Sequence, residues 1–166
     1  MTMIAMFLKE LDQEAVSTRK MLSIVPEDKF NWQPHPRSMT VLRLVKHIAE
    51  LPSWVVLALT TSELDFAATP YEPIKINSTA ELLEVFEKTL EDAKNHLLTA
   101  SEEQLNESWT LRSGDTIYST TSKSETIRHA YCQIVHHRAQ LGVFLRLLDI
   151  PIPGCYGPSA DEMNLL

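Results

Sequence analysis

The sequence has very few glycines and cysteines. Its 166 residues include 4 Gly and 2 Cys. So little glycine argues against an all-β architecture rich in tight turns and favours helices. The two cysteines, Cys132 and Cys155, have no spacing that indicates a zinc knuckle or a disulfide framework. The sequence therefore predicts a helical protein with two reduced thiols.

Basic residues are also in the minority. The chain has 15 Lys and Arg against 22 Asp and Glu, a formal net charge of -7. Binding to nucleic acid phosphates needs a basic face, and there is no Lys/Arg cluster, so nucleic acid is not an expected partner. No apolar run reaches membrane length, and the N-terminus lacks the basic and apolar regions of a signal peptide. We therefore expect a cytoplasmic protein with no membrane association, folded as a single domain over residues 1–166.

Apolar residues at three- and four-residue steps predict the helices. The first helix spans residues 4–22 and ends before Pro26. The next stretch, 30–37, contains two prolines and is expected to be an ordered aromatic loop. A second helix begins at a polar cap at 38–40 and continues to about Leu59, with a kink at Pro52.

Two capping-box sequences, in which a serine and a glutamate three residues later bond to each other's backbone, predict further helices. The box at 78–81 opens a third helix, and the box at 122–125 opens a fourth helix that ends before Pro151. Residues 102–119 form either a short hairpin or a long loop. The predicted fold class is all-α, an up-and-down four-helix bundle with long loops before the second and fourth helices.

Two histidines occupy inward-facing positions on different helices. His47 borders the apolar face of the second helix, and His137 shares the apolar stripe of the fourth. Gln133 lies one turn before His137 on the same face, so the three side chains converge if the two helices are neighbours. Imidazoles suit zinc, nickel, iron or copper, and a three-ligand site leaves a position open for water or substrate. The alternative is that each histidine is a hydrogen-bonded core residue, which is commoner and which the pattern alone favours.

Two further residues near this trio are alternative ligands. Glu50, three residues after His47, either binds a metal, accepts a hydrogen bond from a histidine ring or lies in solvent. His129 lies at an offset of about 80° from His137, which directs it toward a different neighbour. No Ser/His/Asp or Cys/His nucleophile set is readable in the sequence.

Three stretches of the chain together resemble the DinB-like family of damage-inducible four-helix bundles, which is related to metal-dependent thiol transferases. They are Phe30-Asn-Trp-Gln-Pro-His-Pro-Arg-Ser38 followed by Leu44-Val-Lys-His-Ile48, then Ile134-Val-His-His-Arg-Ala-Gln-Leu141, then Pro153-Gly-Cys-Tyr-Gly-Pro-Ser-Ala-Asp161. The second stretch resembles the family's His-His-Arg-Gly-Gln signature, with Ala139 at the glycine position. The third resembles the tail that closes over the end of the bundle.

The resemblance implies a divalent metal (nickel, zinc or iron) held by one histidine of the second helix and two of the fourth, four residues apart. In this chain those positions are His47, Gln133 and His137. An amide oxygen is a weaker, neutral ligand for such metals, so the departure at Gln133 lowers the expected affinity. The resemblance also implies homodimers and, in some relatives, attack by a metal-bound low-molecular-weight thiol on a small electrophilic substrate.

Two functions are expected as alternatives. The first is a metal-dependent enzyme, either a thiol transferase or a hydrolase, acting on a small molecule. The second is a non-catalytic, metal-poor, stress-related dimeric bundle in which the same polar trio binds water or a small ligand.

Overall fold

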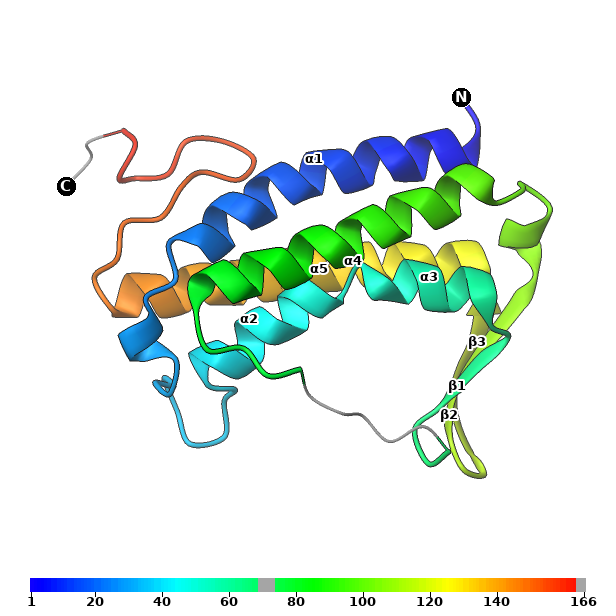
Figure 1. Cartoon of the computed structure of the whole chain (residues 1–166), viewed down its shortest axis with the longest axis horizontal. Helices are drawn as coiled ribbons and strands as arrows, with labels where there is room; N and C mark the ends of the chain where they lie inside the picture. The colour runs from blue at the N-terminus through cyan, green and yellow to red at the C-terminus, as the bar shows by residue number, and fades with distance from the viewer. Residues whose placement is uncertain (69–73, 164–166) are drawn as a thin grey trace.

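The computed structural model describes residues 1–68 and 74–163. Five helices dominate it: α1 (Met3–Ser23), α2 (Val41–Glu50), α3 (Ser53–Thr60), α4 (Thr79–Thr99) and α5 (Lys123–Leu147). In Figure 1, α4 lies in front of α5, between α1 and the α2–α3 pair. Helix α1 packs against α4 and α5, and so do α2 and α3. The helices therefore form a four-membered bundle in which α2 and α3 together take one position.

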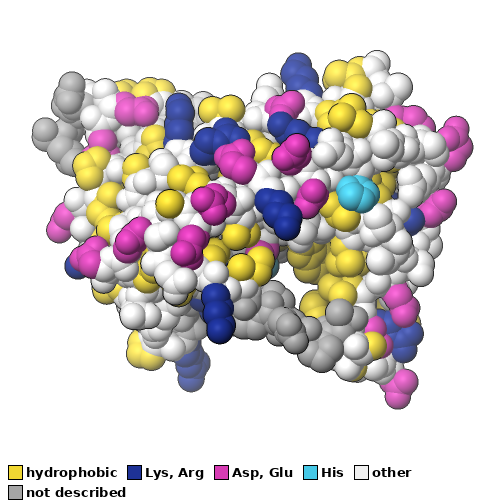
Figure 2. Space-filling model, viewed as in Figure 1, with side chains coloured by type: hydrophobic (Ala, Val, Ile, Leu, Met, Phe, Trp, Pro, Cys, Tyr) yellow, Lys and Arg dark blue, Asp and Glu magenta, His cyan; other side chains and the backbone are white. Residues whose placement is uncertain are grey.

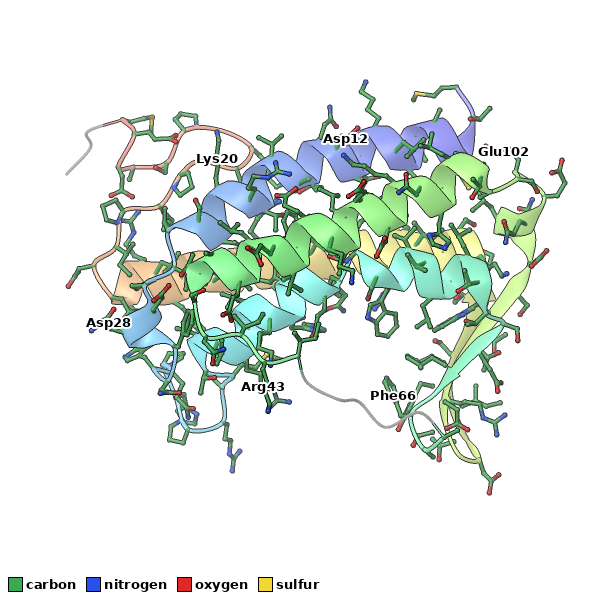
Figure 3. All side chains as sticks on the ribbon, viewed as in Figure 1. Asp12, Lys20, Asp28, Arg43, Phe66 and Glu102 are labelled. Carbon is green, nitrogen blue, oxygen red and sulfur yellow. The ribbon has the colours of Figure 1, made fainter. Side chains whose placement is uncertain are left out.

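The helix starts follow from their capping residues. Ser122 and Glu125 form the predicted capping box at the start of α5. At α4, Ser78 accepts a hydrogen bond from the Glu81 N–H, but the Glu81 carboxylate accepts from the Asn77 N–H at 2.7 Å. The predicted reciprocal box at 78–81 is thus only half formed. Figure 3 shows Glu102 beside the first turn of α1, where its carboxylate accepts from free N–H groups at the positive end of that helix.

Pro52 breaks the second predicted helix instead of kinking it. A proline has no N–H, and its ring clashes with the carbonyl four residues earlier. The chain ends α2 at Glu50 and resumes as α3 at Ser53, with the Val55 N–H bonded to the Pro52 carbonyl at 3.1 Å. The break places His47 in the last turn of α2.

The prediction of an all-α fold is wrong in one respect, because a small sheet is present. Strands β2 (Ser108–Ser113) and β3 (Thr116–Ser122) form an antiparallel hairpin, the first of the two alternatives for this region. Gly114 in its turn has φ of 55°, where an L side chain would be strained. Strand β1 (Glu63–Asp65) adds in parallel to β2. Three residues are too few to show an alternating pattern, so β1 was not predicted.

Apolar side chains from all five helices form one buried cluster. The side chains visible on the face in Figure 2 are mostly charged or polar over α1 and α4, whereas hydrophobic side chains show in the recess between the helices and the sheet. No helix within residues 1–68 and 74–163 is long and apolar enough to cross a membrane.

The segment after α5 folds back along α1 and α5. Asp161 fixes it there, because its carboxylate forms a bidentate pair with Arg146 at 2.9 and 2.6 Å and accepts from the Ile152 N–H at 2.9 Å. These contacts lower the pKa of Asp161 to about 2.

The attachment of this segment is therefore expected to depend on pH only in acid. Because the folded pKa of Asp161 lies below its unfolded value, its contribution is complete above that unfolded value and is lost as the pH falls toward about 2. The amide chemical shift of Ile152 should follow this titration. An Ile152 amide that titrates at the usual carboxyl pKa would contradict the assignment, and Asp161→Asn should abolish the titration.

Candidate metal site

His47 and His137 face each other across the bundle. Their ring centroids are 4.6 Å apart and the ring planes are nearly perpendicular, at 76°. His137, in the middle of α5, is 9% exposed, and His47, in the last turn of α2, is half-buried. Two imidazoles from different helices thus meet at one point, because α2 and α5 are in contact along the bundle.

Gln140 fixes the tautomer of His137. The Nδ1 of His137 lies 2.9 Å from Oε1 of Gln140. An amide oxygen can only accept, so Nδ1 carries the proton and Nε2 carries the lone pair. The amide nitrogen of Gln140 donates in turn to Nε2 of His136 at 3.1 Å. A partner of this kind orients metal-binding histidines in known sites. Sequence reasoning missed this role, although the three-residue spacing from His137 to Gln140 on a helix is the signal for it.

Gln133 and His47 line one cavity of about 200 Å³. The amide nitrogen of Gln133 lies 3.3 Å from Nε2 of His129, to which it donates. A cation would therefore be bound by the amide oxygen of Gln133. His129 also lines this cavity, and it lines a second one together with Trp54 and Trp109, whereas the described walls of both lack His137. Of the two alternative ligands, His129 is among the described residues that line this cavity and Glu50 is not.

The environment of His47 keeps its imidazole neutral. Burial lowers the pKa of His47, and the nearby His137 and Arg43 lower it further. Figure 3 shows the Arg43 side chain on the outer side of α2, directed away from the bundle. At neutral pH the ring of His47 is uncharged, which is the form that binds metals.

The donor set is compatible with a weak divalent metal site. Within residues 1–68 and 74–163, no group of three or more His, Cys, Asp or Glu side chains is placed to hold a metal ion. What the site offers instead is two facing imidazoles, one with its Nδ1–H bonded to Gln140, and an amide oxygen beside a cavity. Nitrogen and oxygen donors of this type suit zinc, nickel or iron, with lower affinity than three imidazoles.

Comparison with known protein families identifies the family of this chain. Residues 1–164 match the DinB family. The chain belongs to the DinB family. Comparison with curated proteins gave no match.

Solved structures share the fold of this DinB-family chain. A DinB-like protein from Bacillus subtilis aligns with a TM-score of 0.70 at 16% identity, over 90% of this chain and 97% of its own. YfiT from Bacillus subtilis, a probable metal-dependent hydrolase with an unusual four-helix-bundle topology, aligns at 0.64 and 15% identity over 89% of each chain. A mycothiol-dependent maleylpyruvate isomerase aligns at 0.62 and 17% identity, over 86% of this chain and 63% of its own. Identities this low show a common fold.

Arg138 connects the His-His-Arg stretch of this DinB protein to α1 and to the C-terminal segment. Its side chain is 3% exposed. It pairs with the Glu14 carboxylate at 2.6 Å and donates to Oγ1 of Thr18 at 3.1 Å and to the Tyr156 hydroxyl at 2.8 Å. The stretch that carries His137 is therefore fixed against α1 by a buried ion pair next to the site.

Proposed function

We propose that His47 and His137, with Gln133 as a weaker third ligand, hold a divalent metal such as zinc, nickel or iron. We further propose that this DinB protein is a metal-dependent enzyme, a hydrolase or a thiol transferase. The observation that carries the proposal is the pair of facing imidazoles with the Nδ1–H of His137 bonded to Gln140. With Nδ1 bonded to Gln140, Nε2 is the ring nitrogen of His137 that would hold a metal, as in sites where a second residue orients the histidine.

The residues of the site have distinct roles in this proposal. His47 supplies a neutral ring nitrogen because its pKa is lowered. Gln140 positions His137, and the cavity beside His47 leaves room for a water or a thiol. A bound divalent metal lowers the pKa of a coordinated water or thiol and so supplies a nucleophile. The names of two structural neighbours, a probable metal-dependent hydrolase and a mycothiol-dependent isomerase, support this reaction class.

A second candidate function is a non-catalytic, metal-poor bundle. It is favoured by one observation, the contact between the Gln133 amide nitrogen and His129, which gives the Gln133 side chain a hydrogen-bond partner without a metal. In that case the cavity would hold water or a small ligand. The homodimer stays a prediction, which the mass of the protein in solution tests.

Metal binding by untagged protein separates the two candidates. After removal of metal with a chelator, titration with zinc or nickel should show one ion bound per chain. His137→Ala should abolish this binding, because it removes one of only two imidazole ligands. His35→Ala is the matched control, since His35 is exposed in the loop before α2 and its loss should change nothing.

Two outcomes would contradict the proposal. One is the absence of bound metal at any supplementation. The other is equal binding by the parent, the His137→Ala variant and the His35→Ala variant, which would place the metal elsewhere. If metal binds as expected but the metal-loaded protein shows no hydrolytic or thiol-transfer activity against simple electrophiles, the non-catalytic candidate is favoured.

A further inference from the structure

A second cavity of about 230 Å³ adjoins the candidate metal site. It lies between the sheet and the first turns of α5, and its wall includes Trp109, Leu111 and Thr121. Trp54 and His129 line both this cavity and the one beside His47. The two cavities therefore share a wall, and a ligand in the second one would have its inner end beside the candidate metal site.

The helix α5 links the two cavities in sequence. Glu125, His129, Gln133 and His137 follow one another at four-residue steps, each turned by about 40° from the one before, so this stripe winds from the exposed side of the helix at Glu125 to its buried side at His137. At about 1.5 Å per residue, Glu125 and Gln133 are roughly 12 Å apart along the axis. Glu125 lines the outer cavity, the one of about 230 Å³ between the sheet and α5, and Gln133 lines the inner cavity beside His47. The stripe thus extends from an acidic end to the imidazole pair.

Two tryptophans give the outer cavity its apolar character. The Trp54 and Trp109 rings are 6.2 Å apart and tilted by 57°. Trp109 is 2% exposed, and its indole N–H donates to Oγ1 of Thr61 at 3.0 Å. Its ring is held in place with its polar atom already bonded. Trp54, which is half-buried, therefore presents ring surface to a ligand beside the buried Trp109, and such surface favours apolar groups and cations.

Glu125 is the ionised side chain within the described wall of this cavity. Its carboxylate accepts from the Ser122 N–H and hydroxyl, both at 2.8 Å. These bonds lower the pKa of Glu125, so it is negatively charged at neutral pH. Nε2 of His129 accepts a hydrogen bond from the amide nitrogen of Gln133. A carboxylate that lines the same cavity as two tryptophans attracts an organic cation and repels an organic anion.

We propose that the outer cavity binds a small organic amine, with its ammonium group near Glu125 and its apolar or aromatic part along Trp54 and Trp109. This proposal names the substrate class of the metal-dependent enzyme and in that respect rests on the proposed function. The reactive group of the substrate would then lie at the shared wall, beside His47. The amine-binding property itself belongs to the cavity and does not need a metal.

Fluorescence of metal-free protein tests the binding step. The chain has three tryptophans, and Trp32→Phe leaves only Trp54 and Trp109, the two that line the cavity. Phenethylamine is the probe, and 3-phenylpropionate and 2-phenylethanol are its anionic and neutral counterparts. We expect a saturable change of emission with phenethylamine, at an affinity at least about threefold above that for either counterpart.

Two variants, each with a matched control, identify the site. Glu125→Gln retains the capping box, which accepts glutamine, and should remove the preference for the amine. Glu81→Gln changes the residue at the same place in α4 and should have no effect. Ser119→Phe adds a ring to the cavity wall on β3 and should weaken binding of all three probes. Thr116→Phe, on the same strand outside the wall, should not.

Equal affinities for the amine and the carboxylate, or an unchanged preference in Glu125→Gln with a native circular dichroism spectrum, would overturn the proposal. So would the absence of any saturable change. Since the titration uses metal-free protein, its result is independent of the metal titration. If the protein prefers the amine but binds no metal, the amine site stands and the proposed metal-dependent enzyme is refuted. If it binds metal but shows no preference for the amine, the amine site is refuted and the proposed metal site stands.

Discussion

Replacing Gln133 by histidine is expected to convert a weak metal site into a tight one. The substitution places a third imidazole one turn before His137, beside the cavity that His47 lines. An imidazole is a stronger ligand than a neutral amide oxygen for zinc or nickel. In known sites, removing a residue that orients a metal ligand lowers the metal affinity roughly 10- to 100-fold. Adding a ligand should have at least as large an effect, so we expect the affinity to rise by at least that factor. Calorimetric titration of untagged, metal-free protein measures the change.

Gln13→His is the control for this experiment. Gln13 is exposed on α1, so the variant adds a surface histidine without adding a ligand to the site, and its affinity should equal that of the parent. A Gln133→His protein with the affinity of the parent would contradict the position of the site. It would also count against the interpretation that Gln133 marks a metal site whose third ligand has been lost.

Arg138→Met is expected to destabilise the fold strongly. The guanidinium is buried, and methionine leaves the Glu14 carboxylate, which is 12% exposed, without its 2.6 Å partner. Removing one member of a buried pair costs about 3–5 kcal/mol. For a chain of this size each kcal/mol lowers the Tm by about 2–4 °C, so a fall of roughly 6–20 °C is expected. Thermal unfolding followed by circular dichroism measures it.

Arg19→Met provides the comparison for Arg138. Arg19 and Glu87 also form a bidentate pair between two helices, but their side chains are 42% and 46% exposed. Pairs this exposed contribute about 0–1 kcal/mol, so the Tm should change little. In the double variant Glu14→Leu with Arg138→Met, no unpaired charge is left, and part of the stability should return. Equal effects of the two arginine substitutions would show that burial does not decide the outcome.

The helices could be predicted from the sequence because their signals are local. Apolar spacing and capping residues placed α1, α4 and α5 within a few residues of their observed ends. The effect of Pro52 was recognised, but its extent was not, because whether a proline kinks or ends a helix depends on packing. The pairing of β1 with β2 joins residues 63–65 to residues 110–112. No local pattern carries that information.

The candidate site could be predicted only where its signals are local. Helical projection placed His47 and His137 on inward faces, and the structure brings their rings together. Helical spacing makes the contacts of His137 with Gln140 and of Gln133 with His129 possible, but whether such hydrogen bonds form depends on side-chain rotamers, which the sequence does not specify. The outer cavity was also missed, since its wall combines α3, the hairpin and α5.

Anomalous diffraction from crystals of the untagged protein grown with zinc tests the central claim most directly. Data collected above and below the zinc absorption edge locate the metal without reference to activity. A peak in contact with the rings of both His47 and His137, on the side of the Gln133 amide oxygen, is the result that the proposed site predicts. Zinc bound elsewhere on the chain, with no peak between the two histidines, would contradict it.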